Sequence, residues 1–288
     1  MRAGMKPLRF LSAQIAARDP TDVSPVRSAG SYSELIPLER ALNQQFSSAA
    51  DRIRREQAFV HDAAHELRTP LAAIATQAHV LALSEGSSRV DALRRLEAAV
   101  GRCSHLVQQL LSLARADARG HAPEHRPDSR AEAFDLMDLL SDTLALLEPA
   151  ARSAACELSL EGPEQAPVAA DKELFRSVIV NLVDNALKYG ASGGSVEVSL
   201  ERGGQWWTLS VADRGPGVDE ADQDRAFERF WRRPGQAVSG TGLGLAIVRE
   251  VMHGLGGKAV LTTRAGGGCL AQATWPIART LPPPQARG

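Results

Sequence analysis

The sequence predicts a helical hairpin that dimerises into a four-helix bundle, followed by an α/β sandwich. Heptad-spaced apolar residues between about 46 and 117 indicate the hairpin, and interleaved helix-period and strand-period runs between about 134 and 278 indicate the sandwich. The length agrees: 288 residues, 44% of them hydrophobic, suffice for two or three domains with their own cores.

Composition excludes several functional classes. The 33 Lys and Arg residues nearly balance the 34 Asp and Glu residues, and only 5% of residues are aromatic, so nucleic acid is not an expected partner. The three cysteines are scattered without a Cys-x-x-Cys pair, which argues against a disulfide framework or a structural zinc site. No stretch approaches the ~18 apolar residues of a membrane-spanning helix.

The first zone, residues 1–45, carries a short and weaker apolar seam on either side of a Pro/Asp/Ser-rich loop at 19–33. Two successive steps of four, from Leu38 to Leu42 to Phe46, shift the phase of the seam where the next zone begins, as a stutter does. The seam residues of this zone are Leu8, Leu11, Ile15, Leu35, Leu38 and Leu42.

The second zone, residues 46–117, contains two long heptad seams separated by the helix-breaking cluster at 84–88. One apolar stripe per helix cannot be buried within a two-helix hairpin, so we expect a homodimer that closes a four-helix bundle; docking within the chain is the alternative. The first seam is Phe46, Ala50, Ile53, Gln57, Val60, Ala64, Leu67, Leu71, Ile74, Ala78 and Leu81, and the second is Leu93, Leu96, Val100, Cys103, Val107, Leu110 and Ala114.

A Pro- and Gly-containing linker at 118–133 leads to the third zone, residues 134–278, and residues 279–288 are expected to be a disordered tail. The third zone has helix-period runs at 134–147 and 174–187 and strand-like runs at 195–200 and 206–211. Gly203-Gly204 between the strand-like runs predicts a hairpin turn, which favours an α/β sandwich over a parallel sheet.

His65 follows seam residue Ala64, so we expect it on the accessible flank of the bundle. Glu66 can accept the proton of one ring nitrogen and leave the other nitrogen as a nucleophile, and Thr69, one turn on, can position a water. Pro70 should bend the helix, because the carbonyl of Glu66 loses its amide partner. An ordinary solvent-facing histidine is the plain alternative.

A zinc site is a further alternative, since His61 lies four residues before His65. The zincin pattern His-Glu-x-x-His nevertheless fails, because Thr69 stands four residues beyond His65.

A second constellation suits a nucleotide. Asn181, Asn185 and Lys188 share one helix face, where amide oxygens suit Mg²⁺ and the lysine suits a phosphate. Further along, 213–217 (Asp-Arg-Gly-Pro-Gly) follows a strand-like run, and 240–245 (Gly-Thr-Gly-Leu-Gly-Leu) opens a helix whose backbone amides can cradle a phosphate. Taken alone, the helix motif is also typical of a solvent-exposed helix face, and the glycine motifs are also typical of ordinary turns.

Two resemblances follow from these motifs. The string at 65–71, His-Glu-Leu-Arg-Thr-Pro-Leu, resembles the phospho-acceptor box of sensor histidine kinases. The pieces at 181–189, 213–217, 227–230 and 240–245 resemble, in order, the N box, first glycine box, F box and second glycine box of the ATP-binding domain shared by histidine kinases, gyrase, Hsp90 and MutL, the Bergerat or GHKL fold.

The resemblance implies roles for individual residues. Asn185 would bind Mg²⁺, Asn181 and Lys188 would contact phosphates, Tyr189 would lie against the base, and Asp213 would hydrogen-bond the adenine amine. Residues 231–239 would form a short ATP lid. The remaining expected nucleotide contacts are Gly215, Gly217, Phe230, Gly240, Thr241, Gly242, Leu243, Gly244 and Leu245.

The resemblance also implies an activity. MgATP would phosphorylate His65 with Glu66 as base, and the phosphoryl group would pass to an aspartate on the receiver domain of a response regulator, with Thr69 at the position used for dephosphorylating that regulator. The first zone looks like a HAMP module, which would place this core behind a missing transmembrane segment, on the cytoplasmic side of the bacterial inner membrane. A non-catalytic nucleotide-binding dimeric scaffold and an ATPase without phosphotransfer are the competing hypotheses.

Overall fold

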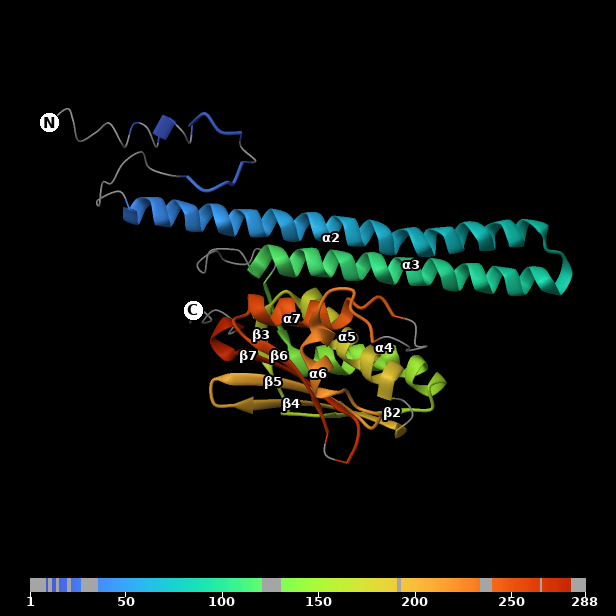
Figure 1. Cartoon of the computed structure of the whole chain (residues 1–288). Coiled ribbons are helices and arrows are strands. Elements are labelled where there is room, and N and C mark those ends of the chain that lie inside the picture. The colour runs from blue at the N-terminus through green and yellow to red at the C-terminus, as the bar shows by residue number, and fades with distance from the viewer. Residues whose placement is uncertain are drawn as a thin grey trace, which may run out of the picture. The chain divides into compact units, whose positions relative to one another are not determined.

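The computed structural model describes residues 36–120, 131–190, 193–233, 240–264 and 266–280, together with short pieces between residues 9 and 26 (Figure 1). The chain divides into two compact units, residues 1–69 and 70–288. Several predictions fall outside the described residues: the seam at Leu8, Leu11, Ile15 and Leu35, the linker at 121–130, the lid at 234–239 and the tail at 281–288.

In the first unit, the piece 22–26 is tied to helix α2 (Ile36–Leu83). The side-chain amide of Asn43 accepts the Val26 amide proton at 2.7 Å and donates to the Val26 carbonyl at 2.9 Å. Arg18 lies over the Phe46 ring, 5.4 Å from its centroid. Part of the predicted loop is therefore held against the start of the long helix by pairing of its backbone.

Helices α2 and α3 (Gly86–Gly120) form the predicted hairpin, joined by Ser84 and Glu85. The connection is shorter than the cluster at 84–88, because α3 already begins at Gly86, which has φ +57°. Helix α2 continues through Pro70, and none of its 48 residues, all of them described, is buried.

Helix α3 carries two neighbouring stripes at seven-residue spacing. Ala92, Ala99, Leu106 and Leu113 are buried, whereas the seam residues one position further along, Leu93, Val100 and Val107, are exposed. Helix α3 packs against α7 (Gly244–Gly254) and α5 (Lys172–Gly190) of the following domain. It thus docks within the chain on one stripe and leaves much of the predicted bundle seam open.

The α/β domain contains a five-stranded sheet in the order β2-β4-β5-β7-β6 and a small antiparallel pair of β1 and β3. Strand β2 runs parallel to β4, and the other pairs are antiparallel. The bounds are β1 Glu132–Asp135, α4 Leu136–Ser153, β2 Glu157–Glu161, β3 Pro167–Ala170, β4 Ser195–Gly203, β5 Trp206–Asp213, α6 Glu220–Gln223, η3 Arg225–Phe227, β6 Lys258–Thr263, β7 Cys269–Pro276 and η4 Ile277–Arg279.

The predicted hairpin of β4 and β5 is confirmed, with Gly203 paired to Trp206 across the turn. Both predicted helical runs are also present, as α4 and α5.

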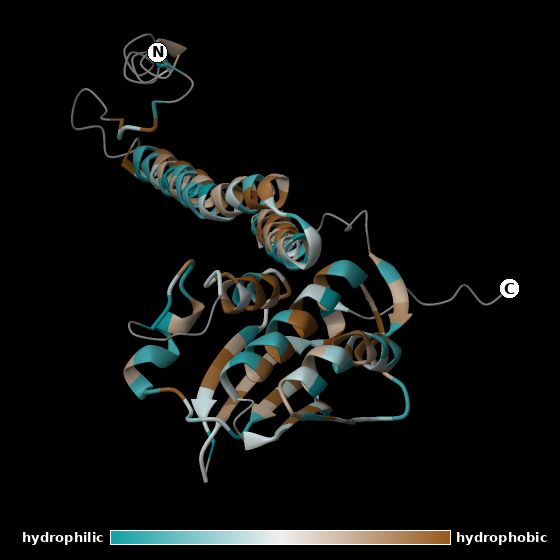
Figure 2. Cartoon of the chain, turned by 90° about the vertical axis from the view of Figure 1, so that its right-hand side faces the viewer, coloured by the Kyte–Doolittle hydropathy of each residue, from teal (hydrophilic) through white to brown (hydrophobic). Residues whose placement is uncertain are grey.

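Helices α4, α5 and α7 cover one face of the five-stranded sheet (Figures 1 and 2). Alternate residues of the strands face this layer, as the buried Val196, Val198 and Leu200 of β4 show. Phe175 of α5 lies edge-on to Trp275 of β7, with ring centroids 5.2 Å apart. The sandwich therefore has its own core, and it holds the start of α7 and the middle of α5 in fixed positions.

Candidate functional site

Helix α5 presents the first group of predicted site residues. Its start is capped by Asp171, whose Oδ1 accepts the amides of Glu173 at 3.0 Å and Leu174 at 3.1 Å. Ten residues after this cap, Asn181 is only 4% exposed, and its Nδ2 donates to the Ser177 carbonyl at 2.8 Å. The cap and the buried amide fix the position of this face relative to the sheet.

Asn185 and Lys188 continue that face toward solvent. Asn185 is half-buried, and the exposed Lys188 pairs with Asp184 one turn back. A Cβ added at Gly244, the first residue of α7, would lie 3.0 Å from Asn181 Oδ1 and 3.5 Å from Asn185 Nδ2. The structure therefore brings the N-box amides against the second glycine box, with glycine providing the space between them.

Asp213 ends β5 beside the last residues of α5. Its Oδ1 accepts the amide of Gly215 at 2.8 Å and that of Cys269 at 3.1 Å. Because Oδ1 already accepts hydrogen bonds from two backbone amides, Oδ2 is the oxygen suited to accept a hydrogen bond from a ligand amine. Gly217, at φ +77°, closes the same loop.

The approach of Asp213 to α5 requires glycine at position 190. A Cβ on Gly190 would lie 2.2 Å from the Asp213 Cβ, far inside any permitted contact. One on Gly215 would lie 2.6 Å from the Tyr189 carbonyl oxygen. The structure thus brings Tyr189, Asp213 and Gly215 together.

The thiol next to this carboxylate is unreactive. Burial, together with the negative charge of Asp213, raises the pKa of Cys269 to about 12. Cys269 therefore stays protonated at neutral pH and is not a nucleophile of this site.

The F box and the second glycine box are fastened to each other. The Phe230 amide donates to the Gly242 carbonyl at 3.0 Å, and Phe230 itself has φ +61°, which is uncommon for a residue with a side chain. Gly242 has φ +71°, and a Cβ there would lie 2.6 Å from the Phe230 carbonyl carbon. Only glycine fits this position.

The other residues of the second glycine box lie close to this contact, at the start of α7. Thr241 Oγ1 accepts the Leu243 amide at 3.3 Å, and Leu243 is fully buried just before α7. The Tyr189 hydroxyl lies 3.4 Å from where a Cβ of Gly240 would stand, and the half-buried Leu245 is in the first turn of α7. The predicted nucleotide-box residues thus lie on the second half of α5, at the end of β5, after η3 and at the start of α7.

The predicted acceptor histidine lies in the first unit. The His65 side chain is 71% exposed, and its Nδ1 is 3.8 Å from Glu66 Oε1, within ion-pair range but longer than a hydrogen bond. Thr69 is exposed one turn further along α2. The expected accessibility of His65 is confirmed.

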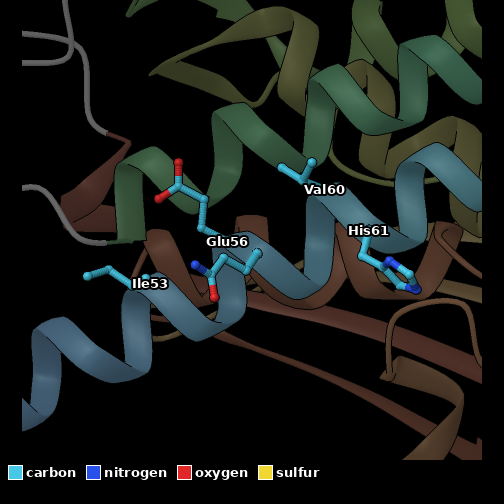
Figure 3. Close-up of a pocket in the computed structure, with 5 residues that line it drawn as sticks. Ile53, Glu56, Val60 and His61 are labelled. Carbon is cyan, nitrogen blue, oxygen red and sulfur yellow. The ribbon is translucent and has the colours of Figure 1, made fainter. Parts of the chain in front are cut away.

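A hollow on α2 lies close by in sequence. It is lined by Ile53, Glu56, Gln57, Val60 and His61 (Figure 3). Three of these five, Ile53, Gln57 and Val60, belong to the predicted bundle seam, so the hollow lies on the surface for which the sequence predicts a dimer contact. Among the described residues, no group of three or more His, Cys, Asp or Glu side chains could hold a metal ion.

Comparison with known proteins separates two regions of the chain. Residues 55–119 match the His Kinase A (phospho-acceptor) domain, and residues 170–279 match the family of histidine kinase-, DNA gyrase B- and HSP90-like ATPases. The chain belongs to the sensor histidine kinase family.

Individual relatives agree. Over 262 residues the kinase chain is 36% identical to the swarming motility regulation sensor protein RssA of Serratia marcescens, covering 90% of the chain and 54% of RssA. It is 36% identical to the sensor protein QseC of Salmonella typhimurium over 276 residues, 94% of the chain and 59% of QseC. The solved histidine kinase AdeS of Acinetobacter baumannii has 25% identity and a TM-score of 0.58, with 74% of the chain and 98% of AdeS covered.

The kinase chain therefore spans somewhat more than half the length of the curated relatives it matches. Within the described ranges, no helix is both long and apolar enough to cross a bilayer.

The sequence did not indicate three features of this histidine kinase site. Gly190 provides the contact with Asp213, but a glycine at a helix end is more often read as a terminator. Arg229 pairs with Asp117 of α3 at 2.6 Å. Gln109 of α3 hydrogen-bonds to both Asn181 and Thr241. Since both contacts from α3 depend on how it docks, no local pattern could have revealed them.

Proposed function

We propose that this chain binds MgATP in the α/β domain, transfers the γ-phosphoryl group to His65, and passes it on to an aspartate of a response-regulator receiver domain. The observation that carries the proposal is the set of close contacts that join the four predicted boxes, between Gly244 and Asn181, Gly190 and Asp213, and Phe230 and Gly242. The same chain exposes a histidine in a phospho-acceptor box.

Each part of the site suits one part of the nucleotide. The Asp213 carboxylate, held through Oδ1, would accept the adenine amine, and Tyr189 would lie against the base. The α7 N-terminus with its glycines and the ammonium of Lys188 would hold the phosphates. Because these groups are fixed before the ligand arrives, binding orients the γ-phosphate at little further cost in entropy.

A magnesium ion fits this donor set. An amide oxygen from Asn185 is a hard neutral ligand, and Mg²⁺ normally completes its shell with waters and phosphate oxygens rather than with a protein cage. When bound, the ion would neutralise charge on the phosphates during transfer.

In the transfer step, one ring nitrogen of His65 attacks the γ-phosphorus, a P–N bond forms, and the bond from that phosphorus to the bridging oxygen of ADP breaks. Glu66 takes the charge that develops on the ring by accepting the proton of the other nitrogen. The 3.8 Å separation of Nδ1 and Oε1 must close for this, and both exposed side chains can rotate to do so. Phosphatase activity would use a water positioned by Thr69.

The assembly is part of the same proposal. The exposed seam of α2 and α3 would close against a second copy in a four-helix bundle. By its resemblance to a HAMP module, the first zone would connect this core to a membrane-spanning part.

The test is incubation with Mg²⁺ and ATP labelled at the γ-phosphate, comparing the wild-type chain with His65→Gln. We expect acid-labile, base-stable label on the wild type and none on the variant. Label that survives on the variant would contradict His65 as acceptor. Nucleotide binding without label would favour the dimeric scaffold, and phosphate release without label would favour a plain ATPase.

A further inference from the structure

Gln109 of α3 occupies the phosphate side of the candidate site from outside the α/β domain. The side chain is 6% exposed, and its two polar atoms are both used. Nε2 donates to Asn181 Oδ1 at 2.9 Å, and Oε1 accepts from Thr241 Oγ1 at 2.7 Å. One amide thus bridges the N box and the second glycine box.

This bridge uses one group that a phosphate would need. Asn181 Nδ2 donates to the Ser177 carbonyl at 2.8 Å, and Asn181 Oδ1 accepts from Gln109 Nε2 at 2.9 Å. A phosphate oxygen is an acceptor and does not compete for Oδ1, so the shared group is the hydroxyl of Thr241. Thr241 Oγ1 directs its single proton to Gln109 and accepts the Leu243 amide. A phosphate oxygen that took the Thr241 proton would displace Gln109.

The docking of α3 holds Gln109 in place. Leu106, Leu113 and Ala116 lie on the same helix face as Gln109 and are buried, and α3 packs on α7 and α5. At the end of this face, Asp117 pairs with Arg229 at 2.6 Å, and Arg229 also lies 3.7 Å from Glu250 of α7.

We propose that Gln109 is an internal competitor of the nucleotide, so that docking of α3 through Gln109 and donation of the Thr241 hydroxyl proton to a phosphate exclude each other. This inference rests on the proposed nucleotide site. It makes the docked state an autoinhibited one, and it means that anything that moves α3 changes nucleotide affinity. By linkage, the nucleotide must weaken the docking of α3 by the same factor.

Binding of AMPPNP with Mg²⁺ to the full chain tests the competition by calorimetry. In Gln109→Ala, we expect the nucleotide to bind about 3- to 10-fold more tightly, since it no longer displaces one or two hydrogen bonds. Gln108→Ala is the matched control, because Gln108 is the exposed neighbour on the same helix, and its affinity should equal that of the wild type.

The other outcomes are distinguishable. If the wild type binds AMPPNP and Gln109→Ala binds equally or more weakly, the competition is wrong while the proposed nucleotide site stands. If neither protein binds, both proposals fail.

A second variant and a second measurement protect the test against damage at position 109. Asp117→Asn loosens the same docking away from the phosphates and should tighten AMPPNP binding by about twofold, as expected for a partly exposed ion pair. In the wild type, AMPPNP should speed hydrogen exchange of the backbone amides at 106–116. Unchanged or slower exchange in that segment would overturn the proposal even if the variants misfold.

Discussion

Helices α2 and α5 are both amphipathic, yet they differ in how much of the apolar face is buried. Helix α2 buries none of its residues, and Val60 on its seam is 61% exposed. Helix α5 is 19 residues long and buries ten of them between the sheet, α4 and α7. The difference teaches that an apolar period specifies a helix and its apolar face, whereas the partner of that face is not specified by the period. Helix α5 finds its partner within the chain, and we propose a second copy as the partner of α2.

Helix α3 stands between these cases. One of its stripes is buried and holds the residues that dock on α7 and α5, and the adjacent stripe is exposed. We therefore expect α3 to be the element through which changes in the proposed bundle reach the proposed nucleotide site.

The largest effect on stability should come from a substitution in the core of the α/β domain. Phe175→Ala removes a ring that is 1% exposed and packed against Trp275 and Phe134, and we expect the free energy of unfolding of the α/β domain to fall by about 3–5 kcal/mol. Tryptophan fluorescence during urea unfolding reports this domain selectively, because all four tryptophans lie between 206 and 275. The control Leu146→Ala, at a mostly exposed position of α4, should change stability by less than about 0.5 kcal/mol.

The next largest effect should come from a substitution on the exposed seam of α2, and it should act on dimerisation. Val60→Glu places a charge on the exposed seam, and it should weaken dimerisation by about 3 kcal/mol while the unfolding of the α/β domain stays unchanged. Analytical ultracentrifugation over a range of concentrations measures the dimer affinity. Ala58→Glu adds the same charge off the seam, at an exposed position of α2, and should leave the affinity intact. Equal weakening by both variants would contradict a seam-mediated dimer.

A smaller effect should follow at the closely packed edge of the site. Gly190→Ala forces a methyl group to within 2.2 Å of the Asp213 Cβ, so the backbone must move apart at a cost of about 1–3 kcal/mol. We expect AMPPNP affinity to fall by roughly tenfold or more, because Asp213 and Tyr189 are displaced with it. The matched control is Gly203→Ala, where a Cβ would meet nothing within 4 Å. Normal affinity in Gly190→Ala would show that this contact does not position Asp213.

The smallest effect concerns helix α3 and the pH dependence of the free energy of unfolding. Burial lowers the pKa of His105 on α3, the nearby Asp184 opposes that shift, and Lys188 adds to it. A histidine with a lowered pKa in the folded state favours unfolding once the unfolded chain takes up protons, so stability is full above about pH 6.5 and is lost as the pH falls through the folded pKa.

Thermal unfolding midpoints between pH 7.5 and 5 should therefore decrease less in His105→Gln than in the wild type. The exposed His253 offers the control, since His253→Gln should keep the wild-type slope. The same slope in all three proteins would refute the role of His105.

Much of the fold could be predicted because its signals are local. Heptads gave α2 and α3, and alternation with a Gly-Gly turn gave β4 and β5 in the correct pairing. The predicted boxes also come together in space, since each box combines a helix or strand end with glycines where backbone must approach closely. These features depend on neighbours within a few residues.

The remainder depends on contacts between distant segments. Nothing around Gln109 distinguishes it from Gln108 in the sequence, yet the first is buried on Asn181 and Thr241 while the second is exposed. Similarly, the seam at Leu93, Val100 and Val107 was predictable, but half of the adjacent buried stripe consists of alanines, Ala92 and Ala99, whose burial follows only from docking. Periodicity cannot choose between two neighbouring stripes.

The strand order has a consequence for how the site forms during folding. Strands β4 and β5 pair through a tight turn, but β5 pairs with β7 only after the chain from 214 to 268 has been laid down, with Leu209 opposite Ala273. Loop closure makes that second pairing the slower one. Asp213 receives one of its two amides from Cys269 at the start of β7, so its carboxylate is fully oriented only when this late strand has joined. We therefore expect competence to bind nucleotide to appear after the hairpin has formed, in step with the closing of the sheet.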